Sequence, residues 1–168
     1  MKNIVLIGMM GCGKSTVGRH LAQVLGREFA DTDALVEARE GRSVAEIFAG
    51  EGEPFFRTRE LELSRELAAR EGLVISCGGG LPMEEGCMEA LSSGTVFWLD
   101  RDPGETWESL DTTHRPLAQR GREDFLARYS LRAPTYRRWA HHIISGAPSA
   151  EDAARAILSI LQHEENTP

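Results

Sequence analysis

The sequence predicts an α/β fold of three layers, with helices on both faces of a mostly parallel sheet. Short apolar segments typical of buried strands alternate with longer segments of helical periodicity. The first apolar segment leads into a glycine-rich turn, and a helical segment follows at once. This alternation favours parallel strands, because each crossover helix returns the chain to the same end of the sheet. A chain of 168 residues fits one domain with a sizeable core.

The first strand, predicted at residues 4–7, is followed by a helix that ends at Gly26. Glycine is favoured just after a helix because it adopts the left-handed backbone conformation at little cost. The apolar residues of this helix recur at helical spacing, which predicts a core-facing side made of Val17, Leu21, Val24 and Leu25.

The next elements are shorter. A second strand is predicted at about residues 28–30, and it ends just before Asp31-Thr32-Asp33. Two short helices follow at about residues 34–40 and 43–49. The second of them begins with the capping-box pattern Ser43-x-x-Glu46, in which two side chains satisfy free backbone N–H groups.

The middle of the chain begins with a long helix at about residues 54–71. Pro54 suits the first turn of a helix, and no proline follows it in this segment. Its core-facing stripe is predicted to contain Phe56, Leu63 and Leu67. The apolar run at residues 73–77 is predicted as a buried strand that leads directly into Gly78-Gly79-Gly80.

The last part of the chain repeats the alternation. Strands are predicted at 95–99 and 141–145, and helices at about 83–91, 102–110, 122–139 and 150–163. Pro134 predicts an interruption or kink in the helix that contains it. Residues 111–121 are polar and rich in Thr and Arg, which favours a mobile connection.

The composition argues against several classes of function. The net charge of −7 does not suit general nucleic-acid binding, which requires a basic face. Lys2 and Lys14 are the only lysines, so the guanine-binding motif Asn-Lys-x-Asp is absent and a regulatory GTPase is not expected. Because no apolar run could cross a bilayer and no leader pattern opens the chain, we expect a cytoplasmic protein without membrane contact. The cysteines are odd in number and lack metal-site spacing, which predicts reduced thiols.

Residues 8–15 have the pattern G-x-x-x-x-G-K-S between the first strand and the first helix. Such a loop curls so that its N–H groups point at phosphate oxygens, and the dipole of the following helix adds about half a positive charge. We expect Lys14 to contact the β- and γ-phosphates and Ser15 to bind Mg²⁺. The predicted nucleotide-binding residues are Gly11, Cys12, Gly13, Lys14, Ser15 and Thr16.

Two carboxylates follow the second strand. Asp31 and Asp33 lie at its carboxyl end, the edge of a parallel sheet where ligands bind. The extended chain gives way to a turn there, so the two side chains can point in different directions. We therefore expect one to face the metal ion and the other to face the phosphoryl acceptor.

Six motifs occur in the order in which they occur in shikimate kinases: Gly8 to Ser15, Asp31-Thr32-Asp33, Phe56-Arg57, Gly78-Gly79-Gly80, Arg115-Pro116-Leu117 and Arg132-Ala133-Pro134. The sequence therefore resembles the shikimate kinase family over nearly its whole length. This resemblance implies a P-loop kinase fold with a five-stranded parallel sheet in the order 2-3-1-4-5. It also implies a single domain over residues 1–168, with a mobile lid at about 111–124 and a substrate-binding helical region at about 33–61.

The resemblance implies that ATP phosphorylates the 3-hydroxyl of shikimate, giving 3-phosphoshikimate on the route to chorismate and the aromatic amino acids. Asp33 matches the aspartate that binds the hydroxyl and serves in catalysis, and Arg57 and Arg132 match the carboxylate-binding arginines. A guanidinium suits that task because it is a planar, permanently charged fork. Gly78, Gly79 and Gly80 match the segment that lines the shikimate site.

The remaining implied roles concern the donor side. Arg115 resembles the lid arginine that closes over the phosphates, where it takes part in catalysis, and Asp31 resembles the residue that holds Mg²⁺ through water beside Ser15. The implied partners are the small molecules shikimate and ATP. A monomer is expected, because the sequence shows no self-complementary apolar stripe.

The sequence departs from the family pattern on the adenine side. Trp107-Glu108-Ser109 replaces the segment that commonly carries an adenine-stacking arginine, and the loop at residues 145–148 lacks basic residues. Two alternatives stay open at this point. A kinase of similar fold could act on another hydroxy acid such as gluconate, or the chain could be a nucleotide-binding regulatory module.

Overall fold

The computed structural model describes residues 1–111 and 120–166. Its centre is a parallel five-stranded sheet in the order β2-β3-β1-β4-β5, which confirms the predicted fold class and strand order. The strands are β1 (Ile4–Ile7), β2 (Phe29–Asp31), β3 (Val74–Ser76), β4 (Thr95–Asp100) and β5 (His142–Ser145). Since all five strands run the same way, their carboxyl ends lie along one edge of the sheet.

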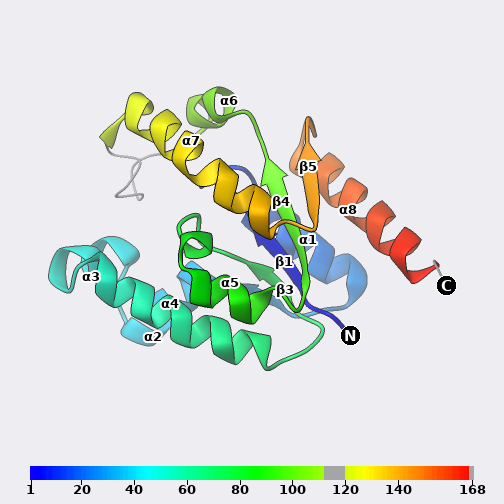
Figure 1. The fold of residues 1–168 in the computed structure, drawn as a ribbon, viewed down its shortest axis with the longest axis horizontal. Helices are drawn as coiled ribbons and strands as arrows, with labels where there is room; N and C mark the ends of the chain where they lie inside the picture. The colour runs from blue at the N-terminus through cyan, green and yellow to red at the C-terminus, as the bar shows by residue number, and fades with distance from the viewer. Residues whose placement is uncertain (112–119, 167–168) are drawn as a thin grey trace.

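Helices cover both faces of this sheet (Figure 1). They are α1 (Lys14–Leu25), α2 (Thr32–Glu40), α3 (Val44–Gly50), α4 (Glu53–Ala68), α5 (Glu85–Leu91), α6 (Pro103–Glu108), α7 (Arg122–Trp139) and α8 (Ala150–Glu165), with the 3₁₀ turn η1 (Leu81–Met83) before α5. In Figure 1, α2 to α5 gather beside β3, whereas α6 and α7 lie beside β4.

The alternation of side chains along the strands creates two separate cores. Val5 and Ile7 of β1 point to the face covered by α4, α5 and α7, whereas Ile4 and Leu6 point to the face covered by α1 and α8. All four are fully buried, at 0–1% exposure. A parallel strand buried on both faces has a continuous apolar sequence, as these four residues do.

The structure corrects several details of the sequence interpretation. Val24 is 54% exposed, because the last turn of α1 follows the final buried residue of that helix, Ala22. The long helix ends at Ala68 and not at Glu71, and the helix predicted from residue 83 begins at Glu85, after the separate turn η1. Helix α7 has the predicted bounds, and Pro134 does not interrupt it.

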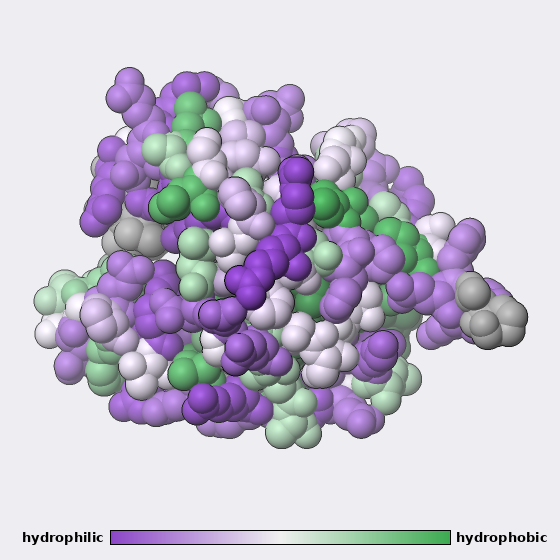
Figure 2. Space-filling view, viewed as in Figure 1, coloured by the Kyte–Doolittle hydropathy of each residue, from purple (hydrophilic) through white to green (hydrophobic). Residues whose placement is uncertain are grey.

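The surface seen in Figure 2 is mostly hydrophilic, and its hydrophobic residues form separate small areas. Within residues 1–111 and 120–166, the large apolar side chains with substantial exposure come from distant parts of the chain, namely Met1, Val24, Met83, Leu131 and Ile143. Among the described residues, no helix has the length and apolar character required to cross a membrane.

Candidate active site

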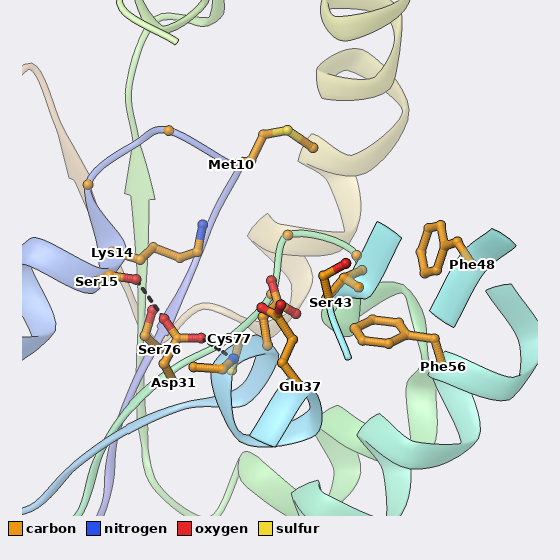
Figure 3. A pocket seen from close by; sticks show the side chains of 18 of the residues that line it. Met10, Lys14, Ser15, Asp31, Glu37, Ser43, Phe48, Phe56, Ser76 and Cys77 are labelled. Atoms are coloured by element: carbon orange, nitrogen blue, oxygen red, sulfur yellow. Dashed lines mark hydrogen bonds between the residues drawn. The ribbon is translucent and has the colours of Figure 1, made fainter. Parts of the chain in front are cut away.

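A cavity of about 730 Å³ opens at the carboxyl edge of the sheet. It receives side chains from the loop after β1, from α2 and α4, from the segment after β3 and from α7. Figure 3 shows Lys14, Ser15 and Asp31 together in one part of the cavity, with Phe48 and Phe56 in another. Residues predicted to bind the phosphoryl donor and residues predicted to bind the acceptor therefore line one continuous space.

The loop between β1 and α1 has the backbone shape of a phosphate-binding loop. Gly8, Gly11 and Gly13 have φ angles of 146°, 78° and 98°, in the region that other residues rarely adopt. Gly13 is the N-cap of α1 and carries no side chain that could cap it, so the first N–H groups of the helix stay available to an anion. Lys14 is 8% exposed, and its ammonium donates to the carbonyl oxygens of Gly8 and Met9, each at 2.8 Å.

Ser15 and Asp31 lie next to each other across the edge of the sheet. The Ser15 hydroxyl donates to Oδ2 of Asp31 at 2.7 Å, and Oδ1 of Asp31 accepts from the N–H of Ala34 at 3.1 Å. The second bond makes Asp31 the N-cap of α2. The carboxylate is thus fixed by its own helix while its other oxygen faces Ser15.

Asp33 lies two residues further along, in the first turn of α2, and it lines the same cavity. Burial raises the pKa of its carboxyl to about 6, and the nearby charge of Asp31 raises it further, while Lys14 and Arg57 act in the opposite direction. A carboxylate with such a pKa can accept a proton near neutral pH more readily than an ordinary aspartate.

Arg57 reaches the cavity from the first turns of α4. Its guanidinium donates to Glu53 at 2.9 Å and to Glu60, whose side chain is fully buried. Burial raises the pKa of Glu60 to about 7, although the neighbouring Arg57 opposes this rise. The two glutamates hold the guanidinium from the side of α4.

Arg132 enters from α7 and is 6% exposed. Its Nη1 atom is buried and has no hydrogen-bond partner among residues 1–111 and 120–166. A buried guanidinium N–H without a partner is costly, so an anionic ligand in this cavity would satisfy it. Arg132 therefore offers this cavity a buried cationic donor suited to an anionic group.

Each glycine after β3 faces one of these polar side chains. A Cβ atom on Gly78 would collide with the carboxyl of Asp33, and one on Gly80 would collide with the guanidinium of Arg57. A Cβ atom on Gly79 would lie 3.2 Å from Nη1 of Arg132. None of the three has a φ angle in the positive region, so here glycine is favoured by the close approach of these groups and not by backbone conformation.

Cys12 faces a second cavity, of about 250 Å³, while its neighbours Gly11 and Gly13 line the first. The second cavity is bounded by the carboxyl ends of β4 and β5 and by the start of α8, through Leu99, Asp100, Arg101, Ile144, Ala147, Pro148, Ser149 and Ala153. Arg101 donates to the Ser109 hydroxyl at 3.3 Å. The segment at 107–109 contains no arginine of its own, but the guanidinium of Arg101 contacts it.

The structure brings together nearly all the predicted site residues. The larger cavity is lined by Gly11, Gly13, Lys14, Ser15, Thr16, Asp31, Asp33, Arg57, Gly78, Gly79, Gly80 and Arg132. Arg115 and most of the predicted lid at 111–124 lie outside the described residues, and residues 122–124 form the first turn of α7.

Sequence interpretation missed three residues that organise this cavity. The Thr32 hydroxyl accepts from the N–H of Gly78 at 2.9 Å and so joins the two segments after β2 and β3. Glu60 is one of four glutamates in α4, and nothing in the pattern separates it from the exposed ones except its position three residues after Arg57. Tyr136, which is fully buried, contacts the glycine segment from α7.

Comparison with known proteins identifies the family. The shikimate kinase family model matches residues 10–162 of this chain. The chain belongs to the shikimate kinase family. Shikimate kinases are ATP-dependent phosphotransferases of aromatic amino acid biosynthesis, and the enzyme class predicted from the sequence is thereby confirmed.

Individual shikimate kinases are similar to this chain over nearly its whole length. The enzyme of Symbiobacterium thermophilum is 44% identical, over 95% of this chain and 96% of the relative. The enzyme of Pelotomaculum thermopropionicum is 42% identical over 96% of both chains. A bifunctional shikimate kinase/3-dehydroquinate synthase of Thermotoga maritima is 36% identical, and there the match covers 96% of this chain and 33% of the longer relative.

Solved structures of shikimate kinases have the same fold. The Acinetobacter baumannii shikimate kinase in complex with shikimate superposes with a TM-score of 0.94 at 37% identity, over 99% of this chain and 96% of that one. The shikimate kinase of Aquifex aeolicus superposes with a TM-score of 0.85 at 34% identity, over 98% of both chains.

Proposed function

We propose that the larger cavity holds shikimate beside the γ-phosphate of ATP and transfers that phosphoryl group to the 3-hydroxyl. The observation that carries this proposal is that the phosphate loop lines the same cavity as Asp33, Arg57 and Arg132. An aspartate and two arginines suit the hydroxyl and the carboxylate of a hydroxy acid. Phosphoryl transfer depends mainly on positioning and on stabilising charge, because its transition state is loose.

The phosphate loop forms the donor half. Its N–H groups and the N-terminal dipole of α1 face the phosphates, together with Gly11, Cys12, Gly13, Lys14, Ser15 and Thr16. The second cavity, next to Cys12, takes the nucleoside, with Pro148 and Arg101 among its walls. We retain Arg115 as a phosphate contact of the lid on the family resemblance alone, since it lies outside the described residues.

The acceptor half consists of side chains from α2, α4 and α7. Arg57 and Arg132 bind the shikimate carboxylate, and the unpartnered Nη1 of Arg132 gives that anion a ready donor. Asp33 accepts a hydrogen bond from the 3-hydroxyl and takes its proton as the bond to phosphorus forms. These residues fall in the proposed substrate-binding region at 33–61, in the segment after β3 and in α7.

The residues present fit a magnesium ion. Ser15 and Asp31 offer a hydroxyl and a carboxylate oxygen 2.7 Å apart, and hard oxygen donors are the ligands that Mg²⁺ prefers. No cluster of three or more His, Cys, Asp or Glu that could hold a metal occurs within 1–111 and 120–166. We assign Ser15 as a ligand of the ion and Asp31 as a contact through water, because Mg²⁺ keeps several waters in protein sites. When bound, Mg²⁺ neutralises charge on the phosphate oxygens.

A coupled assay with ATP and Mg²⁺ tests the proposal. We expect turnover with shikimate well above the ATPase background, and turnover with gluconate near that background, because two arginines and the glycine segment enclose a compact acid. Hydrolysis of ATP at the same rate with and without shikimate would contradict the proposal and favour a regulatory module. Faster turnover with gluconate would assign another acceptor.

Substitution of Gly80 tests the acceptor site. In Gly80→Ala the new methyl group would displace the Arg57 guanidinium, and we expect the KM for shikimate to rise by about tenfold or more, in line with the loss of one charge-assisted hydrogen bond. The backbone of Gly80 has φ −91° and ψ −11°, which alanine adopts without strain.

Gly86→Ala provides the matched control. Gly86 lies in α5, away from the cavity, and its Cβ would lie 3.2 Å from a methyl carbon of Leu61. We expect an unchanged KM for shikimate in this variant. A Gly80→Ala enzyme with wild-type KM would show that Arg57 does not bind the acceptor.

A further inference from the structure

The hydroxyl of Tyr136 lies where the donor and acceptor halves of the cavity meet. Tyr136 is in α7 and is fully buried. Its hydroxyl donates to the carbonyl oxygen of Gly79 at 2.5 Å and lies 3.7 Å from the sulfur of Met9. Met9 belongs to the phosphate loop and Gly79 to the glycine segment, so one side-chain atom contacts both.

The glycine segment comes close to both the phosphate loop and Arg132 of α7 at Gly79. A Cβ atom built on Gly79 would lie 3.3 Å from the backbone nitrogen of Met10 and 3.5 Å from the carbonyl oxygen of Gly8. The same atom would lie 3.2 Å from Nη1 of Arg132. A shift of Gly79 would therefore change the spacing between the phosphate loop and the carboxylate-binding arginine.

Tyr136 and Arg132 are four residues apart in α7, so they lie on the same face of the helix. The Tyr136 ring is fixed by packing against Trp98 of β4, with ring centroids 5.7 Å apart. Burial raises the pKa of the Tyr136 hydroxyl to about 12, and the nearby Arg132 opposes the rise. The hydroxyl thus keeps its proton at neutral pH and remains a donor to the Gly79 carbonyl.

We propose that Tyr136 is a positioning residue that holds the phosphate loop, the glycine segment and Arg132 in the spacing required for transfer. Tyr136 does not line the larger cavity and so contacts neither substrate directly. It acts through its hydrogen bond to Gly79 and through its position in α7, the helix that carries Arg132. The inference rests on the proposed function, because spacing between the halves matters only if phosphoryl transfer joins them. It predicts that loss of the hydroxyl affects turnover more than the binding of either substrate alone.

Tyr136→Phe tests this role, since it keeps the ring and removes the hydroxyl. We expect kcat to fall by about tenfold or more, because a displacement of about 1 Å between reacting groups can cost about a hundredfold in rate. The dissociation constants of shikimate and of ATP, each measured alone by calorimetry, should stay within about threefold of wild type, since each half stays intact. Thermal unfolding, followed by circular dichroism, establishes that the variant is folded at the assay temperature.

Tyr129→Phe is the matched control in the same helix. The Tyr129 hydroxyl donates to Asp100 at 2.7 Å, so its removal also costs α7 one part-buried hydrogen bond. Tyr129 lines neither cavity, and at saturating ATP we expect its kcat to stay within about twofold of wild type. An equal fall in kcat in both variants would overturn the proposal, because it would reflect a general loosening of α7.

The remaining outcomes separate this inference from the proposed function. If wild-type enzyme does not phosphorylate shikimate, the proposed function fails; if wild type is active and folded Tyr136→Phe keeps its kcat, only the positioning role fails. Should Tyr136→Phe not fold, Met9→Leu removes the sulfur contact on the loop side. A kcat lowered by about threefold or more in Met9→Leu, with both dissociation constants retained, then supports the role, and an unchanged kcat contradicts it.

Discussion

Replacing Lys14 with alanine is expected to lower kcat by about a thousandfold while the protein stays folded. In phosphoryl transfer the enzyme supplies fixed charge near the transferred group, and loss of one well-placed donor costs about a hundredfold to a thousandfold. Lys14 is the only lysine in the cavity, and it is nearly buried among loop carbonyls, where its charge is poorly screened by water. We expect the KM for ATP to rise as well.

The control for this experiment is the second lysine of the chain. Lys2 is exposed near the N-terminus, so Lys2→Ala removes the same charge from the protein and should leave kcat unchanged. Lys14→Ala also removes the donor to the Gly8 and Met9 carbonyls, and its unfolding temperature must therefore be measured beside its activity. If folded Lys14→Ala kept more than a tenth of wild-type kcat, the assigned role of the loop would be wrong.

The fold could be predicted because most local signals agree with one another. The apolar runs of β1, β3 and β4, the capping box at Ser43 and the glycine after α1 each specify one element. The errors lie at ends of elements, where burial by neighbours decides the outcome. Val24 has the spacing of a core residue, but its turn of α1 lies beyond the other buried residues of that helix, and no pattern within the helix shows this.

The site could be predicted where a residue acts through a local pattern, and not where it acts through a distant partner. The phosphate loop directly follows β1, and Asp31 is the last residue of β2, so their place at the sheet edge follows from the topology. Glu60 and Tyr136 matter because of side chains and carbonyls that the fold brings to them. The helical segments around Glu60 and Tyr136 have ordinary sequences, and only the packed structure distinguishes these two residues from other residues of α4 and α7.

Asp33→Asn is expected to lower kcat by about a hundredfold to ten-thousandfold, the range typical of a lost general base. Asparagine preserves the shape of the side chain and can still accept a hydrogen bond, so shikimate binding should change little. The loss of activity then reflects the missing proton acceptor. A kcat within about threefold of wild type would show that Asp33 only orients the hydroxyl.

The pH profile of the wild-type enzyme gives a second measurement of the same residue. Asp33 must be ionised to accept a proton, and burial raises its pKa from 3.8 to about 6. We therefore expect kcat/KM to fall below about pH 6, tenfold for each further pH unit, whereas an ordinary aspartate would sustain activity to about pH 4. The residual activity of Asp33→Asn should lack this inflection.

As the pH rises, ionisation of Asp33 should increase activity but decrease the stability of the fold. A carboxyl whose pKa is higher in the folded state binds its proton more tightly there, so its contribution to stability is greatest below the unfolded pKa of about 4 and is lost as the pH rises through about 6. Above pH 6 the ionised Asp33 destabilises the fold, and Asp33→Asn removes that cost. We expect the variant to unfold at a higher temperature than wild type at pH 8, by a few degrees at this chain length, and the difference to shrink below pH 5. An Asp33→Asn protein less stable than wild type at pH 8 would contradict this prediction. It would mean that ionised Asp33 stabilises the fold, and a structural role would then be enough to explain its burial in the cavity.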